Sequence, residues 1–417
     1  MIATLALAGC AGQAPPATGT ASLPSLLGGS PPYPSTPPAG KASGPVAMLL
    51  PLTGAMAPVG AVLQNAAKLA FPGTAATTLD IRDTGSTPQG AAAAAQAAIA
   101  AGDGMIIGPL TSAEAHAVAP LALAANINML ALTNDSSLDA PGVWTLGITP
   151  TQQVQRVIQA AANAGHTQVA ALLPDNQFGH SLADALTAAT ASLSEPTPSV
   201  SFYEPENFNS LNQAIRQVSD FADRGQDIED KIKKAQDLGT AAGRETARQL
   251  KHQQIPPPPF NALFIGALDG NTLEEAANFL PYYSVYQPGV QYLGPANWAS
   301  LASSMGNQNV FNGALYAAPD PAAAAAFDAK YQSTYGAAPP AIADVAFDAA
   351  AIAAIAGSGG GYTTSVLTDP SGFAGTDGVM RLLPSGEVLR GLAVFQVAPG
   401  APIITSPAPT QLGAPSS

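Results

Sequence analysis

The sequence predicts an α/β protein made of doubly wound parallel sheets. Short continuous apolar runs bounded by turn residues, such as VAMLLP at 46–51, are typical of buried parallel strands. Helical segments follow them, among them an alanine-rich segment closed by Gly102. Strand and helix alternate strictly, which favours a doubly wound sheet. Because 417 residues exceed one ordinary core, we expect two domains.

The elements follow in order along the chain. The first portion predicts strands at 46–51 and from Thr77, strands with their C-terminal loops at 104–112 and 127–135, and helices at 61–71, 88–102 and 113–126. The second predicts strands at 168–175, 199–205, 260–268 and 290–295, with helices at 152–164, 180–191, 210–218 and 273–280. The third predicts a strand at 313–319, helices at 322–335 and 344–355, and a closing hairpin at 379–397 with a Pro-Ser-Gly turn.

The only cysteine of the chain, Cys10, follows a short apolar segment and the small residues of LAGC. A lone cysteine forms no internal disulfide, so it is a free thiol, a metal ligand or a modification site. An apolar run closed by small residues is typical of a secretory signal, although no Lys or Arg precedes this one. Either the true start lies upstream or the signal is degenerate. The alternative is a frayed apolar N-terminus with an incidental cysteine.

The flanking segments are poor in charge and periodicity. Residues 11–44 are rich in Pro, Ala, Gly, Ser and Thr and predict a semi-extended tether. Residues 403–417 have a similar composition and predict a disordered tail. No other stretch reaches the ~20 uninterrupted apolar residues of a membrane-spanning helix.

Charge and motifs exclude several functions. The formal net charge of −13 is a poor match for nucleic acid, because nucleic-acid binders carry basic faces. The four histidines do not stand at metal-ligand spacing. The glycine run at 357–362 lacks the dinucleotide fingerprint, and no nucleophile elbow or phosphate-binding loop is present. We therefore expect no enzyme activity, no cofactor and no metal, and an enzyme of unrecognised mechanism is the remaining alternative.

An unusual segment at 219–254 interrupts the alternation of strands and helices. It contains seven of the 28 acidic and seven of the 15 basic residues, interleaved at helical spacing. This pattern predicts an exposed helix or helical pair. Two interpretations stay open: a solvated excursion without a ligand, and a surface for docking a partner.

The pieces together resemble type I periplasmic binding proteins of the leucine/isoleucine/valine-binding kind. The resemblance rests on LLPLTGAMAPVGAVLQNAAKLAF, on GMIIGPLTSAEAHAVAPLALAANINMLALTND and on VAALLPDNQFGHSLADAL. It implies two doubly wound lobes joined by three crossovers. Lobe one is expected at 45–148 plus 297–375, and lobe two at 149–296 plus 376–402.

In such folds ligands lie between the lobes, at the carboxyl ends of the strands, where loop hydroxyls and helix N-termini converge. The resemblance implies a cleft and, within it, a site for an amino-acid-like ligand. The candidate residues of lobe one are Thr111, Ser112, Thr133 and Asn134, and those of lobe two are Asp175, Asn176, Phe178 and Asp269. Since Ser, Thr, Asp and Asn also begin helices everywhere, the alternative is that these residues are loop caps.

A narrower resemblance concerns lipoproteins that activate penicillin-binding proteins. It rests on the LAGC segment, the tether, LLPLTG, the charged insertion before PFNALFIGA and GTDGVMRLLPSGEVLRGLAVFQV. The best-known members also carry an N-terminal helical repeat domain, for which residues 1–44 leave no room. The resemblance implies a non-catalytic regulator of peptidoglycan synthesis whose partner is a peptidoglycan synthase.

The alternative is the solute-binding component of an ABC importer for branched-chain or other amino acids, whose partner is the permease. In either case we expect residues 1–10 to be a lipoprotein signal and Cys10 to carry acyl chains that anchor the protein in the periplasm. The residue after the cysteine is Ala11 rather than the Asp of inner-membrane retention, which favours the inner leaflet of the outer membrane.

Overall fold

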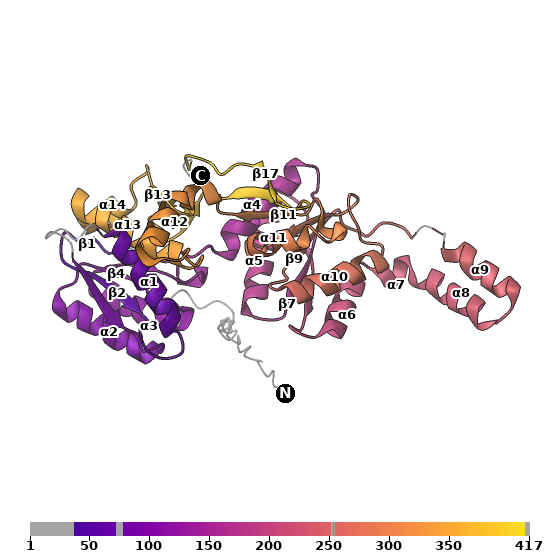
Figure 1. The fold of residues 1–417 in the computed structure, drawn as a ribbon, viewed down its shortest axis with the longest axis horizontal. Coiled ribbons are helices and arrows are strands. Elements are labelled where there is room, and N and C mark those ends of the chain that lie inside the picture. The colour runs from indigo at the N-terminus through magenta and orange to yellow at the C-terminus, as the bar shows by residue number, and fades with distance from the viewer. Residues whose placement is uncertain (1–36, 72–77, 252, 254, 413–417) are drawn as a thin grey trace, which may run out of the picture. The chain divides into compact units, whose positions relative to one another are not determined.

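The computed structural model describes residues 37–71, 78–251, 253 and 255–412. Cys10, the expected signal and most of the expected tether lie outside these described residues. Within them the chain forms two mainly parallel sheets with helices on both faces, so the predicted α/β class is confirmed (Figure 1).

The first lobe contains a five-stranded, fully parallel sheet with the order β3-β2-β4-β5-β6. Its strands are β2 (Val46–Leu50), β3 (Leu79–Asp83), β4 (Met105–Ile107), β5 (Asn128–Ala131) and β6 (Val143–Thr145). Its helices are α1 (Ala57–Ala70), α2 (Pro88–Ala101), α3 (Ser112–Ala124), α12 (Pro321–Tyr335) and α13 (Ala343–Gly359). Alternate residues of β2 enter different cores: Met48 packs in the α1 and α13 core, and Leu49 in the α2 and α3 core.

The second lobe contains a seven-stranded sheet with the order β17-β16-β11-β10-β9-β7-β8. Its strands are β7 (Val169–Pro174), β8 (Ser199–Tyr203), β9 (Ala262–Ile265), β10 (Gln291–Gly294), β11 (Leu315–Ala318), β16 (Ala393–Gln396) and β17 (Ile403–Ser406). The last two strands run antiparallel at one edge. Its helices are α4 (Pro150–Asn163), α5 (Gln177–Ser192), α6 (Phe208–Val218), α10 (Gly270–Tyr282) and α11 (Trp298–Met305).

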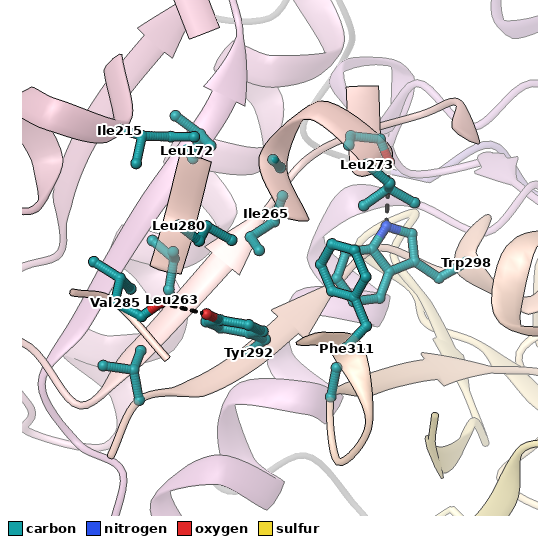
Figure 2. Packing of buried hydrophobic residues seen from close by; sticks show 14 of the residues in the cluster. Leu172, Ile215, Leu263, Ile265, Leu273, Leu280, Val285, Tyr292, Trp298 and Phe311 are labelled. Carbon is teal, nitrogen blue, oxygen red and sulfur yellow. Dashed lines mark hydrogen bonds between the residues drawn. The ribbon is translucent and has the colours of Figure 1, made fainter. Parts of the chain in front are cut away.

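One core of the second lobe is rich in aromatic side chains (Figure 2). Trp298 is fully buried, and its indole N–H donates to the carbonyl of Ala267 at 3.2 Å. Phe311 packs edge-on against the Trp298 ring with centroids 6.1 Å apart. The Tyr292 hydroxyl donates to the Val285 carbonyl at 2.7 Å. Both the Trp298 N–H and the Tyr292 O–H therefore have a hydrogen-bond partner inside this core.

The charged insertion forms helices, as predicted. They are α7 (Phe221–Arg224), α8 (Gln226–Asp237) and α9 (Ala241–Lys251), and α8 packs against α9 as a helical hairpin (Figure 1). The remaining elements are β1 (Gly40–Lys41), β12 (Tyr362–Thr363), α14 (Thr364–Leu367), β13 (Phe373–Gly375), β14 (Gly378–Leu382), β15 (Val388–Arg390) and the short 3₁₀ turns Ser136–Leu138 and Asn309–Phe311.

The expected lobe boundaries are wrong at two places. Helix α11 and strand β11 pack in the second lobe, so the chain returns to the first lobe near 319–320 rather than at 297. Strands β14 and β15 form the expected hairpin, but their side chains at Met380 and Val388 pack in the first-lobe core. The final crossing therefore falls at 391–392 rather than at 376. A short apolar strand does not encode which sheet it joins, because that choice depends on distant partners.

Two flanking segments expected to lack structure contain strands. Strand β1, inside the expected tether, pairs with β12, and strand β17, inside the expected tail, pairs with β16. The Ile403-Ile404-Thr405 run is β-branched, which suits a strand, and β16 offers it an open edge. A strand at the edge of a sheet pairs through its backbone, which needs only an extended chain. Composition alone therefore did not predict these two pairings.

Replacing Trp298 should test the second-lobe core. Trp298→Ala removes a fully buried ring and leaves the Ala267 carbonyl without its donor, so we expect a loss of about 3–5 kcal/mol in unfolding free energy. Trp298→Phe keeps most of the packing and should cost about 1–2 kcal/mol. Urea unfolding followed by circular dichroism measures both, and equal losses for the two variants would contradict this account.

Candidate functional site

A cleft of about 1000 Å³ lies where the chain passes between the two sheets. From the first lobe it is lined by the N-terminus of α3, the end of β5 and the start of α13. From the second lobe it is lined by residues 296–300 at the start of α11. The crossing segments at 147–148 and 318–321 complete it. The cleft therefore occupies the carboxyl ends of parallel strands, where ligands of open α/β sheets bind.

Thr111 and Ser112 begin α3 in this cleft, as expected, but their hydroxyls are engaged within the protein. The Thr111 hydroxyl donates to Glu114 Oε2 at 2.7 Å. The Thr111 amide donates to the same oxygen at 3.2 Å and the Glu114 amide donates to the Thr111 hydroxyl oxygen at 3.3 Å, which together form a capping box. Glu114 is buried, and its other oxygen accepts from the Thr84 hydroxyl at 2.7 Å. A carboxylate of the protein thus occupies the donors that could hold a ligand carboxylate.

The second expected loop of lobe one behaves in the same way. Thr133 and Asn134 line the cleft, and the Thr133 hydroxyl accepts from the Asp135 amide at 3.3 Å. The Ser112 hydroxyl donates to the Asp135 carboxylate, and His116 Nε2 lies 3.3 Å from the same group. Burial acts to raise the pKa of Asp135, but donation by the Ser112 and Ser137 hydroxyls outweighs it and holds the pKa below the ordinary value.

Four carboxylates line the cleft, and its lining contains no Lys, Arg or His. They are Asp320, Asp328, Asp344 and Asp377. Asp320 caps α12 by accepting from the Ala322 amide at 2.9 Å. Burial, together with the charges of Asp377, Asp348 and Asp328, raises the pKa of Asp344 to about 8. The cleft as built therefore opposes the entry of an anionic group.

A buried polar network connects this acidic wall to the crossing segments. Asp348 accepts from the Thr376 amide at 2.8 Å and from the Thr376 hydroxyl at 3.0 Å. The Arg390 guanidinium donates to Asp377 Oδ2 at 3.2 Å and to the Leu146 carbonyl at 2.5 Å. Because Leu146 precedes the first crossing and Arg390 precedes the last, one side chain ties two crossings together.

The candidate residues of lobe two lie elsewhere, and none of them belongs to the cleft lining. Asp175 is exposed and lies 3.0 Å from His180, while Phe178 packs against the second-lobe core. Asn176 caps α5, and Asp269 caps α10 by accepting from the Thr272 amide at 2.9 Å. Thr111, Asn176 and Asp269 are thus helix caps, as the alternative to ligand-binding residues predicted. Whether any candidate residue binds a ligand stays a prediction.

The acidic residues of the cleft were missed in the sequence. Asp320 lies two residues after the end of β11, and Asp344 stands in the first turn of α13, so each carried a positional signal. These positions did not point to the cleft, because the chain was expected to cross between the lobes at 297 and 376 rather than at 319–320 and 391–392. Asp377 lies in a tight connection between two short strands, and nothing local marks it as a cleft residue.

Two searches of the described residues gave negative results. Among them, no group of three or more His, Cys, Asp or Glu side chains is arranged to hold a metal ion. None of the helices in the described part of the chain is both long and apolar enough to cross a bilayer.

Comparison with known families identifies the first part of the chain. Residues 45–220 match the family described as "Periplasmic binding protein". The expected resemblance to type I periplasmic binding proteins is therefore confirmed over this part of the chain. A search of curated proteins finds no match.

Solved structures with the same fold come from transporters and from a regulator. A protein from Rhodospirillum rubrum, provisionally described as a branched-chain amino acid ABC transporter, has a TM-score of 0.66 at 19% identity, covering 87% of this chain and 99% of that one. An ABC transporter substrate-binding protein from Sphaerobacter thermophilus has a TM-score of 0.63 at 14% identity, covering 88% and 98%. The C-domain of LpoA from Haemophilus influenzae, described as a regulator of PBP1A, has a TM-score of 0.60 at 15% identity, covering 87% and 99%. At these identities the likeness establishes the fold alone.

The raised pKa of Asp344 predicts a pH-dependent stability. An unfolded Asp ionises near its ordinary value of 3.8, whereas folded Asp344 holds its proton up to about pH 8. Between these values unfolding releases a proton, so the wild type loses stability as pH rises. Asp344→Asn has no such proton and should exceed the wild type by about 1–2 kcal/mol at pH 8, after discounting for partial exposure.

Thermal unfolding at about pH 4 and pH 8 measures this difference. The advantage of Asp344→Asn should shrink toward the lower pH. The exposed Asp184→Asn change removes one charge from α5 and serves as the matched control. An advantage that is the same at both pH values would contradict the raised pKa.

Proposed function

We propose that this protein is a non-catalytic, envelope-located docking protein that regulates peptidoglycan synthesis in the manner of penicillin-binding-protein activators. One observation carries the proposal: the hydroxyls that would receive a ligand carboxylate are engaged with Glu114 and Asp135, in a cleft walled by four aspartates. A free amino acid entering there would bring its carboxylate near the charges of Asp320 and Asp328, and the lining offers it no Lys, Arg or His. The fold is thus retained without the usual chemistry of an amino-acid cleft.

The fold supports the same proposal. The LpoA C-domain, described as a regulator of PBP1A, has this fold over 87% of the chain. The partner proposed here is a peptidoglycan synthase, and the surface rather than the cleft carries the interaction. The expected acylation of Cys10 and the anchoring of the protein to a membrane belong to this proposal. Two or more acyl chains would hold the body at a membrane surface far better than one.

A second function is favoured by the cleft volume. A space of about 1000 Å³ at strand ends is large enough for a small solute, and its carboxylates match an ammonium group. This observation supports a solute-binding protein of an ABC importer, with a permease as partner. Its ligand would be an amino acid or similar molecule whose positive charge dominates.

A thermal-shift screen separates the two functions. Ligand binding to the folded state raises the melting temperature by mass action. We expect no shift with amino acids, branched-chain and basic ones included, or with peptidoglycan fragments at millimolar concentration. A shift that Asp344→Asn abolishes would assign the protein to solute binding instead.

A synthase assay tests the regulatory function directly. The purified full chain should raise the rate of glycan polymerisation by a bifunctional synthase of the same organism. Ser112→Ala, which alters only the cleft, should leave this stimulation unchanged. If the synthase is neither bound nor stimulated, the regulatory proposal fails.

A further inference from the structure

The α8–α9 hairpin is held in place at its root by a fully engaged guanidinium. Arg224 Nε donates to the Ser219 carbonyl at 2.6 Å, where the insertion begins. Its terminal nitrogens donate to the Pro256 carbonyl at 2.5 Å, where the insertion ends, and to the Tyr283 carbonyl at 3.1 Å, after α10. One side chain therefore fixes both ends of the insertion to the second lobe, and the hairpin is a positioned element.

Aromatic contacts strengthen this root. Phe221 is buried and packs edge-on against Tyr283 with centroids 5.0 Å apart. A hydrogen bond to Glu229 of α8 raises the pKa of Tyr282 to about 12, and the Arg216 guanidinium donates to Gln226 at 2.7 Å. The hairpin is thus joined to α6 and α10 by side chains of both.

The hairpin Gln226–Lys251 is nearly balanced in charge, with six basic and five acidic residues, and its positive charge is concentrated in residues 231–251. Residues 231–251 contain six of the 15 basic residues and only two of the 28 acidic ones. Arg244, Arg248 and Lys251 follow one another at i, i+4 and i+7, so they share one exposed face of α9 over about 10 Å. The remainder of the chain is strongly acidic, so this face is a local reversal of charge.

Three lysines of α8 have no partner within the described chain. Lys231, Lys233 and Lys234 are exposed, and none of them makes an ion pair with a described residue. Acids four residues earlier would suit helix-stabilising pairs, but no such pair forms within 4 Å. These three charges are therefore available to an external anion.

Large exposed side chains at the root and at the tip of the hairpin resemble those of a protein interface. Tyr282 and Tyr286 are 59% and 58% exposed, and Leu238, between α8 and α9, is 66% exposed. Tyr and Arg are the side chains that carry most energy in protein–protein contacts. A membrane-surface helix would instead present a broad apolar face, whereas Ile228, Ala235 and Ala247 of the hairpin are buried. The composition favours a protein partner over a lipid surface.

We propose that the α8–α9 hairpin, with Tyr282 and Tyr286 at its root, docks an acidic surface of a partner protein. The inference rests on the proposed docking function and specifies the surface and the charge of the partner. Long-range attraction between the basic residues of 231–251 and an acidic partner would speed their encounter. The tyrosines would contribute contact area once the two surfaces meet.

Binding of a labelled poly-L-glutamate peptide to the full chain tests the charge requirement. The variant Lys231→Gln/Lys233→Gln/Lys234→Gln keeps residues that favour helix and should weaken binding about tenfold or more at low salt. Binding by the wild type should itself fall as ionic strength rises. The control Asp227→Asn/Asp230→Asn removes charge of the opposite sign from the same helix and should leave binding equal or stronger. Circular dichroism must show that both variants remain folded.

Three outcomes would overturn the inference. One is peptide binding that the triple lysine variant leaves unchanged. Another is lysine-dependent sedimentation with phosphatidylglycerol vesicles in the absence of peptide binding, which would assign the hairpin to a membrane. The third is a lysine-dependent dimer in analytical ultracentrifugation, which would make a second copy the acidic partner.

The synthase assay distinguishes this inference from the proposed function. If the wild type stimulates the synthase and the triple variant stimulates it equally, the proposed function stands and the hairpin inference fails. If the wild type does not stimulate the synthase but binds the acidic peptide through its lysines, the proposed function fails and the hairpin still docks an acidic partner. If the wild type stimulates the synthase and the triple variant does not, the result supports both the proposed function and the hairpin inference.

Discussion

The arrangement of this protein depends on the burial of one guanidinium between two crossings of the chain. The Arg390 side chain is only 1% exposed, and it donates to the Asp377 carboxylate and the Leu146 carbonyl. A buried charge without partners would cost several kcal/mol, so these contacts must form together with the fold. Asp348, which holds Thr376, continues the same network toward α13. The first and last crossings are thereby joined to the acidic wall of the cleft, so a change at Arg390 would affect both the crossings and the wall.

The cleft shows how hydroxyls at strand ends can be engaged by carboxylates of the protein itself. The α3 N-terminus, which would favour an anion, is already paired with Glu114 through a capping box. Ser112 is turned toward Asp135 of the protein itself. Both contacts stabilise the loops at the start of α3. The same residue types at the same places thus serve as caps, and residue identity alone does not reveal which role they have.

The cleft and the hairpin differ in how their charges are collected along the chain. The cleft gathers aspartates from α12, α13 and the loop before β14, whereas the hairpin gathers lysines and arginines within a single insertion. A charged insertion tolerates such composition because its small apolar face needs only a partner helix to bury it. Fixing its ends with Arg224 gives this surface a defined position on the second lobe.

The sequence by itself determined the element types, the parallel α/β class and the helical nature of the insertion, because apolar runs, helical spacing and caps are local signals. It also placed Thr111, Ser112, Thr133 and Asn134 at strand ends that line the cleft. Only the tertiary structure decided that β11 joins the second sheet, that β14 and β15 join the first core, and that Asp344 and Asp377 line the cleft. Those outcomes depend on which distant segments meet, and a strand of four apolar residues fits either sheet equally well until its neighbours are in place.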